Sequence, residues 1–77
     1  MPGDERYREH GRARNEVVEF RGKYVIHRYC YPDTDLCDYH VQGPNLKHAL
    51  FDVERTREPE ILADLRAMIE RASMEGK

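Results

Sequence analysis

The stretch HRYCYPDTDLCDYH, residues 27–40, is the feature that most constrains the fold of this chain. It reads almost as a mirror image about its centre, with Cys30 facing Cys37. Aromatic and β-branched residues flank the sequence PDTD, in which proline fixes the backbone for a turn and aspartate follows it. We therefore predict a β-hairpin whose turn lies within residues 31–36. In this hairpin, residues whose numbers add up to 67 lie opposite each other.

This register decides which side chains share a face of the sheet. Side chains alternate between the two faces along a strand, and directly opposed residues lie on the same face. The two cysteines are then expected to point inward with Tyr39, whereas the two histidines point outward. Exposed tyrosines are typical anchors of protein interfaces, and aspartates at a hairpin tip suit a partner with a basic surface. The predicted partner-binding residues are His27, Tyr29, Tyr31, Asp33, Asp35, Asp38 and His40.

The pattern HxxC…CxxH within the hairpin leaves two other interpretations open. A zinc site needs four ligands around one point, but a regular hairpin divides His27, Cys30, Cys37 and His40 between two faces. A cross-strand disulfide needs the two Cα atoms to be about 4.4–6.8 Å apart. We favour a plain hairpin in which the cysteines are small buried hydrophobic residues. That interpretation includes no metal and no other cofactor.

The residues on either side of the hairpin predict a small α+β domain. EVVEF, residues 16–20, has high strand propensity and is separated from the hairpin by a turn at RGK. Residues 46–54 fit a helical stripe better than a strand, because their apolar residues recur every three or four positions. We expect an antiparallel sheet of two to three strands packed against one or two C-terminal α-helices.

The last segment is predicted to be the main helix. Pro59 suits the first turn of a helix, and Glu58 and Glu60 complement the helix dipole. The apolar positions that follow recur at helical spacing and predict a single buried face. They are Ile61, Leu62, Leu65, Met68, Ile69 and Ala72.

The length of 77 residues allows one domain. Residues 1–15 contain four arginines and little to bury, so they are expected to form a flexible arm in front of a domain at 16–77. A core this small is marginal by itself, which favours self-association as a homodimer. No run of about 18 apolar residues is present, so no membrane span is expected.

Two classes of function are disfavoured by the residues themselves. The only serine is Ser73, and neither a glycine-rich phosphate loop nor an HExxH motif is present, so the protein is expected not to be an enzyme. A three-stranded sheet followed by a helix resembles the arm-binding domains of tyrosine integrases, and this resemblance implies DNA binding. The 13 lysines and arginines are, however, outnumbered by 15 aspartates and glutamates. Nucleic acid is therefore expected to bind only weakly, through the arm at 1–15.

The sequence thus favours a non-enzymatic protein-binding module in the cytoplasm. Its predicted role is that of a regulator, adaptor or inhibitor of a larger complex, as in phage or mobile-element accessory proteins that inhibit host defence machinery. A small nucleic-acid-binding domain is the first alternative. A zinc module that uses HxxC…CxxH is the second.

Overall fold

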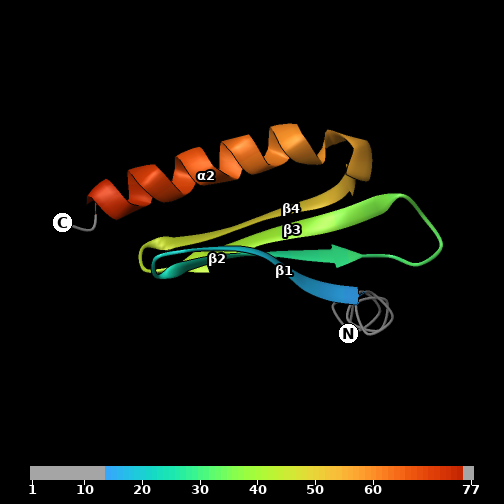
Figure 1. Cartoon of the computed structure of the whole chain (residues 1–77), viewed down its shortest axis with the longest axis horizontal. Coiled ribbons are helices and arrows are strands. Elements are labelled where there is room, and N and C mark those ends of the chain that lie inside the picture. The colour runs from blue at the N-terminus through green and yellow to red at the C-terminus, as the bar shows by residue number, and fades with distance from the viewer. Residues whose placement is uncertain (1–13, 76–77) are drawn as a thin grey trace, which may run out of the picture.

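The computed structural model describes residues 14–75, which form four β-strands and one long helix (Figure 1). The strands form one antiparallel sheet in the order β1-β2-β3-β4. The predicted α+β class is therefore confirmed, with four strands in place of two to three. The elements are β1 (Arg14–Arg21), β2 (Tyr24–Cys30), β3 (Leu36–Gly43), β4 (Leu46–Glu54), the short 3-10 helix η1 (Arg55–Arg57) and the α-helix α2 (Glu58–Glu75).

The predicted hairpin and its register are confirmed at every paired position of β2 and β3. The pairs run from Val25 with Gln42 to Cys30 with Cys37, and each pair adds up to 67. The connection closes with a hydrogen bond from the Tyr31 backbone N–H to the Leu36 carbonyl, at 3.3 Å. The hairpin register therefore follows from the mirror in the sequence.

The helix predicted over 46–54 is wrong, because these residues form strand β4. Its register with β3 shifts between Cys37 and Tyr39, where two residues of β4 lie opposite one residue of β3. Asp52 adopts a positive φ of 56° at this β-bulge. The extra residue brings Val53 to the same face as Leu50, three positions away, and so imitates helical spacing.

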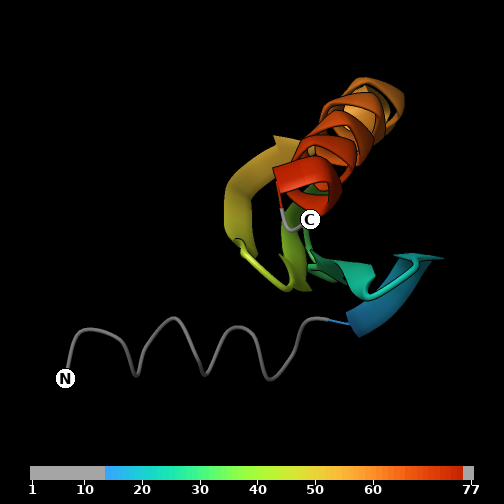
Figure 2. The same ribbon diagram turned by 90° about the vertical axis from the view of Figure 1, so that its left-hand side faces the viewer.

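One face of the sheet packs against α2 to form the core. Figure 2 shows the strands as a curved layer with α2 along its inner side. The helix contributes the predicted apolar stripe, in which Leu62 and Met68 are partly buried and the other members fully buried. Tyr39 is completely buried, as predicted from the register. The buried apolar residues of the sheet are Tyr24, Ile26, Cys37, Tyr39, Val41 and Val53.

A two-residue turn at Pro44 and Asn45 joins β3 to β4. Pro44 occupies the first central position of this turn and Asn45 the second. In such turns the second central residue often has a positive φ, and Asn45 has a φ of 65°. Gly43 precedes the turn, and any Cβ there would collide with the ring of Tyr24. The Tyr24 hydroxyl donates a hydrogen bond to the Pro44 carbonyl at 2.6 Å, which fixes this end of the core.

The predicted arm at 1–15 falls mostly outside the described residues. Arg14 and Asn15 are described and belong to β1, where they pair with Cys30 and Tyr29. The folded domain therefore begins at least two residues before the predicted boundary at 16. Within residues 14–75, no helix has the length and apolar character needed to cross a membrane.

Candidate functional site

The candidate site is the face of the sheet opposite α2. Because strand side chains alternate, the residues between the core positions point away from the helix. Tyr29 pairs with Asp38, His27 pairs with His40, and His27 also pairs with Val17 of β1. On β4, Phe51 follows the inward Leu50 and so belongs to the same outer face. We call Val17, His27, Tyr29, His40 and Phe51 the open-face cluster.

Rings from three adjacent strands meet in this cluster. The ring centroids of Tyr29 and His40 are 4.9 Å apart in an edge-to-face arrangement. His40 and Phe51 follow at 5.7 Å, again edge to face. Val17 and Phe51 each keep 49% of their surface exposed. A row of rings with exposed apolar ends offers rigid contact area at low entropic cost.

The hairpin tip supplies carboxylates in two different environments. Asp33 and Asp35 are exposed in the loop between β2 and β3. Asp38 is completely buried and accepts hydrogen bonds from the Tyr31 hydroxyl at 2.7 Å and from the Asp52 backbone N–H at 2.8 Å. Tyr31 and Asp38 therefore tie the hairpin to the bulge of β4. This pair was predicted as part of the partner-binding surface, and that role stays a prediction.

The structure thus brings together some of the predicted site residues and separates others. His27, Tyr29 and His40 lie side by side on the open face. Phe51 and Val17 belong to the same face but were missed. Phe51 was missed because its segment was predicted as a helix. Val17 was missed because its pairing with His27 depends on a β-bulge in β1.

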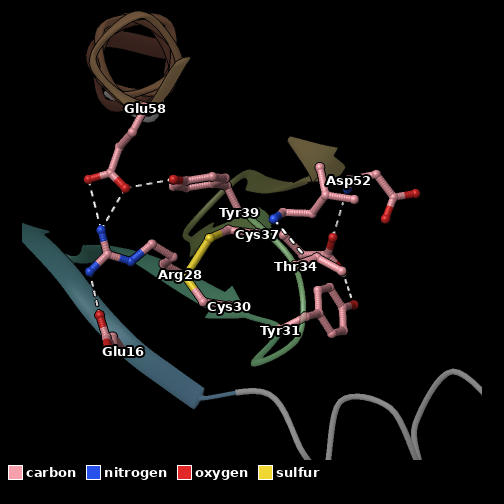
Figure 3. The surroundings of a disulfide bond; sticks show 11 residues. Glu16, Arg28, Cys30, Tyr31, Thr34, Cys37, Tyr39, Asp52 and Glu58 are labelled. Atoms are coloured by element: carbon pink, nitrogen blue, oxygen red, sulfur yellow. Dashed lines mark hydrogen bonds and ion pairs between the residues drawn. A yellow bond between two sulfur atoms is a disulfide. The ribbon is translucent and has the colours of Figure 1, made fainter. Parts of the chain in front are cut away.

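The two cysteines form a disulfide on the inner side of the hairpin (Figure 3). Because the two sulfur atoms are bonded to each other, the interpretation of Cys30 and Cys37 as free buried thiols is wrong. The reason is the register, which makes them direct cross-strand neighbours. The zinc alternative does not fit this geometry, because His27 and His40 lie on the opposite face. Among residues 14–75, no group of three or more possible ligands could hold a metal ion.

A polar network joins the inner face of the sheet to the start of α2 (Figure 3). Arg28 bonds to Glu16 and, at 2.6 Å, to Glu58 of α2. The Tyr39 hydroxyl also donates to Glu58, at 2.6 Å. An arginine between inward-facing Ile26 and Cys30 was the sequence signal for this network, because a charge at such a position needs partners.

The pKa values in this network follow from its contacts. Burial raises the pKa of Tyr39, and its bond to Glu58 raises it further. Burial also raises the pKa of Glu58, but the bonds from Tyr39 and Arg28 outweigh this and hold it below its ordinary value. The hydrogen bond with Arg28 lowers the pKa of Glu16. The shifts favour a neutral Tyr39 and ionised Glu58 and Glu16. These are the forms that make the hydrogen bonds and ion pairs of the network.

A second network links β1 to the middle of α2. Arg66 donates to both oxygens of Glu19, with a shortest distance of 2.7 Å, and Arg21 bonds the same carboxylate at 2.8 Å. The Arg66 and Arg21 bonds lower the pKa of Glu19 to about 2. Both networks fasten the helix, and neither faces the open-face cluster.

Comparisons with models of protein families, with curated protein sequences and with solved structures each found no significant match.

Proposed function

We propose that this chain is a non-enzymatic protein-binding module whose contact surface is the open-face cluster. The observation that carries this proposal is the row of rings at Tyr29, His40 and Phe51, on the face opposite the helix. Tyrosine and phenylalanine are enriched in the buried centre of protein interfaces. The module would act as a regulator, adaptor or inhibitor of a larger complex.

The size of the face favours an extended segment of the partner over a broad globular surface. The four strands are 7 to 9 residues long. With strands about 4.8 Å apart and about 3.3 Å per residue, the face covers roughly 500 Å². A standard interface buries about 800 Å² on each partner. A single extended peptide segment fits the smaller area.

The chemistry of the face favours arginine in that segment. A guanidinium group binds well over an aromatic face, and carboxylates nearby add ion pairs. Asp33, Asp35 and Asp52 are exposed at the end of the sheet where Tyr29 and Phe51 lie. This arrangement supports the expectation of a partner with a basic surface.

We place this function in the cytoplasm, where thiols are generally kept reduced. The proposal therefore requires the hairpin to remain folded without the bond between Cys30 and Cys37. Ile26, Tyr39 and Val41 support this requirement, because their buried side chains hold the same register.

Single-stranded nucleic acid is the second candidate, since bases also stack on aromatic residues of an open sheet. The row of rings favours this candidate, but the charges of the described residues do not. Residues 14–75 carry nine lysines and arginines against twelve aspartates and glutamates. Binding of a polyanion without a basic surface would be weak.

The test is affinity capture from a host lysate with the full chain, Phe51→Ser and Met74→Ser. Met74 is 76% exposed on α2, so Met74→Ser is a matched control that removes an exposed apolar side chain away from the open face. The expected result is a protein retained by the full chain and by Met74→Ser, lost with Phe51→Ser, and insensitive to nuclease. Direct binding of that purified protein then repeats the comparison. Equal capture by Phe51→Ser would refute the proposed surface, and loss on nuclease treatment would favour nucleic acid.

A further inference from the structure

Strand β1 forms one edge of the sheet. Among residues 14–75, it pairs with β2 on one side and with no strand on the other. Figure 2 shows β1 at one rim of the curved sheet and β4 at the other. An edge strand presents unpaired backbone N–H and C=O groups, to which another strand can be added. The side chains of β1 indicate which strand fits.

The bulge in β1 makes the order of its inner and outer side chains symmetrical. Val18 is the extra residue, without a partner on β2, and it packs against the core. The other residues of β1 share a face with their partners on β2, because opposed side chains lie on the same face. From residue 16 to residue 21, the faces run inner, outer, inner, inner, outer, inner. The inner residues are Glu16, Val18, Glu19 and Arg21, and the outer residues are Val17 and Phe20.

This symmetry makes β1 complementary to a second copy of itself. If two β1 strands pair antiparallel with residue numbers that add up to 37, inner residues face inner residues and outer face outer at every position from 16 to 21. A shift of one residue in either direction places Val17 or Phe20 opposite an inner residue. The register is therefore specified by the faces alone.

The same register also matches the side chains by their chemistry. Val17, which is 49% exposed, lies opposite Phe20 of the second copy, which is 73% exposed. Glu16 lies opposite the oppositely charged Arg21 of the second copy. The two-fold symmetry repeats both pairs, and such apolar and charged pairs stabilise antiparallel strands. The like charges of Arg14 and Lys23 do not meet within the paired strands, because Lys23 lies beyond the end of β1 in the turn to β2.

We propose that two copies of this chain pair antiparallel through β1 in this register and form one continuous eight-stranded sheet. The paired segment of six residues is about 20 Å long. This contact is smaller than a standard interface of about 800 Å² on each partner, so the dimer forms reversibly and depends on concentration. His40 and Phe51 lie on β3 and β4, away from this edge, so the pairing does not depend on the proposed function.

The first test uses charge variants at the two exposed outer positions of β1. The variant V17K/F20K places lysine opposite lysine, and V17E/F20E places glutamate opposite glutamate. Each variant alone should dimerise about tenfold more weakly than the unmodified chain in sedimentation equilibrium. An equimolar mixture of the two should recover the dimer, because each lysine then faces a glutamate. Circular dichroism confirms that both variants are folded.

The control M74K adds a charge at an exposed apolar position of α2 and should dimerise as the unmodified chain does. An unmodified chain that stays monomeric up to about 1 mM overturns the proposal, since that corresponds to very weak binding. Unchanged dimerisation of both charge variants, or a mixture of folded variants that stays monomeric, also overturns it.

The second test identifies the register directly. In a mixture of ¹³C-labelled and unlabelled unmodified chains, isotope-filtered NOEs arise only between copies. The proposal predicts NOEs between the methyl groups of Val17 and the ring of Phe20. NOEs between copies at Lys47 of β4 or Met74 of α2, with none between Val17 and Phe20, would contradict it. Neither test requires a captured partner, so the pairing and the proposed function can fail separately.

Discussion

The two faces of the sheet are built from the same strands but differ in what their side chains do. On the inner face, Ile26 and Tyr39 are completely buried, and Arg28 bonds to carboxylates on both sides. On the outer face, the neighbouring positions His27 and Tyr29 keep part of their surface exposed. Alternation along a single strand therefore separates residues that hold the fold from residues that are proposed to bind.

The largest difference between the faces is expected for two tyrosines of the same hairpin. Tyr39→Ala removes a fully buried ring and should cost about 3–5 kcal/mol, which largely unfolds a domain of this size. Tyr29→Ala removes a partly exposed ring and should lower the melting temperature only slightly. Thermal unfolding followed by circular dichroism measures both. A folded Tyr39→Ala beside an unfolded Tyr29→Ala would mean that the faces are assigned the wrong way round.

The polar network of the inner face should also matter for stability. The Arg28 side chain is 16% exposed, and Arg28→Ala leaves Glu16 and Glu58 without their cation. We expect a loss of about 2–3 kcal/mol in urea unfolding, below the value for a fully buried pair because water reaches the site. Glu58→Gln should cost less, since an amide still accepts from Tyr39. Additive losses in the double variant would argue against a coupled network.

Reducing the disulfide should weaken the hairpin without unfolding it. The bond closes a loop between residues seven positions apart. By restricting this loop in the unfolded chain, it should add about 2–3 kcal/mol to the free energy of unfolding. Urea unfolding with and without dithiothreitol measures the difference. Unfolding on reduction alone would remove the support for a cytoplasmic function. No change in the urea midpoint would show that the bond contributes nothing to stability.

Both low and high pH should destabilise the protein by changing the charges of residues on the inner face. The pKa of Glu19 is lowered from 4.5 to about 2, and those of Glu16 and Glu58 are lowered as well. Their stabilisation is therefore complete above pH 4.5 and is lost as the pH falls toward 2. The pKa of Tyr39 is raised above its ordinary value of 10, so its contribution is complete below pH 10 and is lost above it. Urea midpoints measured across this pH range test both expectations. The Glu19→Gln variant should show a smaller fall in midpoint at low pH than the unmodified chain.

The inner face could be predicted from sequence where its pattern was regular. The mirror at residues 27–40 predicted the register, the burial of Tyr39 and the adjacency of the cysteines. It did not decide between free thiols and a disulfide, because both fit two cysteines on one face. The helical stripe after Pro59 likewise predicted which side of α2 is buried.

The outer face could be predicted only in part, because β-bulges interrupt the alternation of the edge strands. The extra residue near Asp52 gave β4 a helical spacing, which concealed Phe51. A register shift after Val17 similarly concealed its pairing with His27. Neither bulge is marked by a glycine, so the local sequence offered no signal for either.

The proposed binding surface is the face opposite α2. It is tested most directly by mapping the captured partner onto the ¹⁵N-labelled chain by chemical-shift changes. If this face binds the partner, the changes will centre on the open-face cluster, and the exposed residues of α2 will be unaffected. The cluster residues are Val17, His27, Tyr29, His40 and Phe51. Changes centred on α2, with the open-face cluster unaffected, would contradict it.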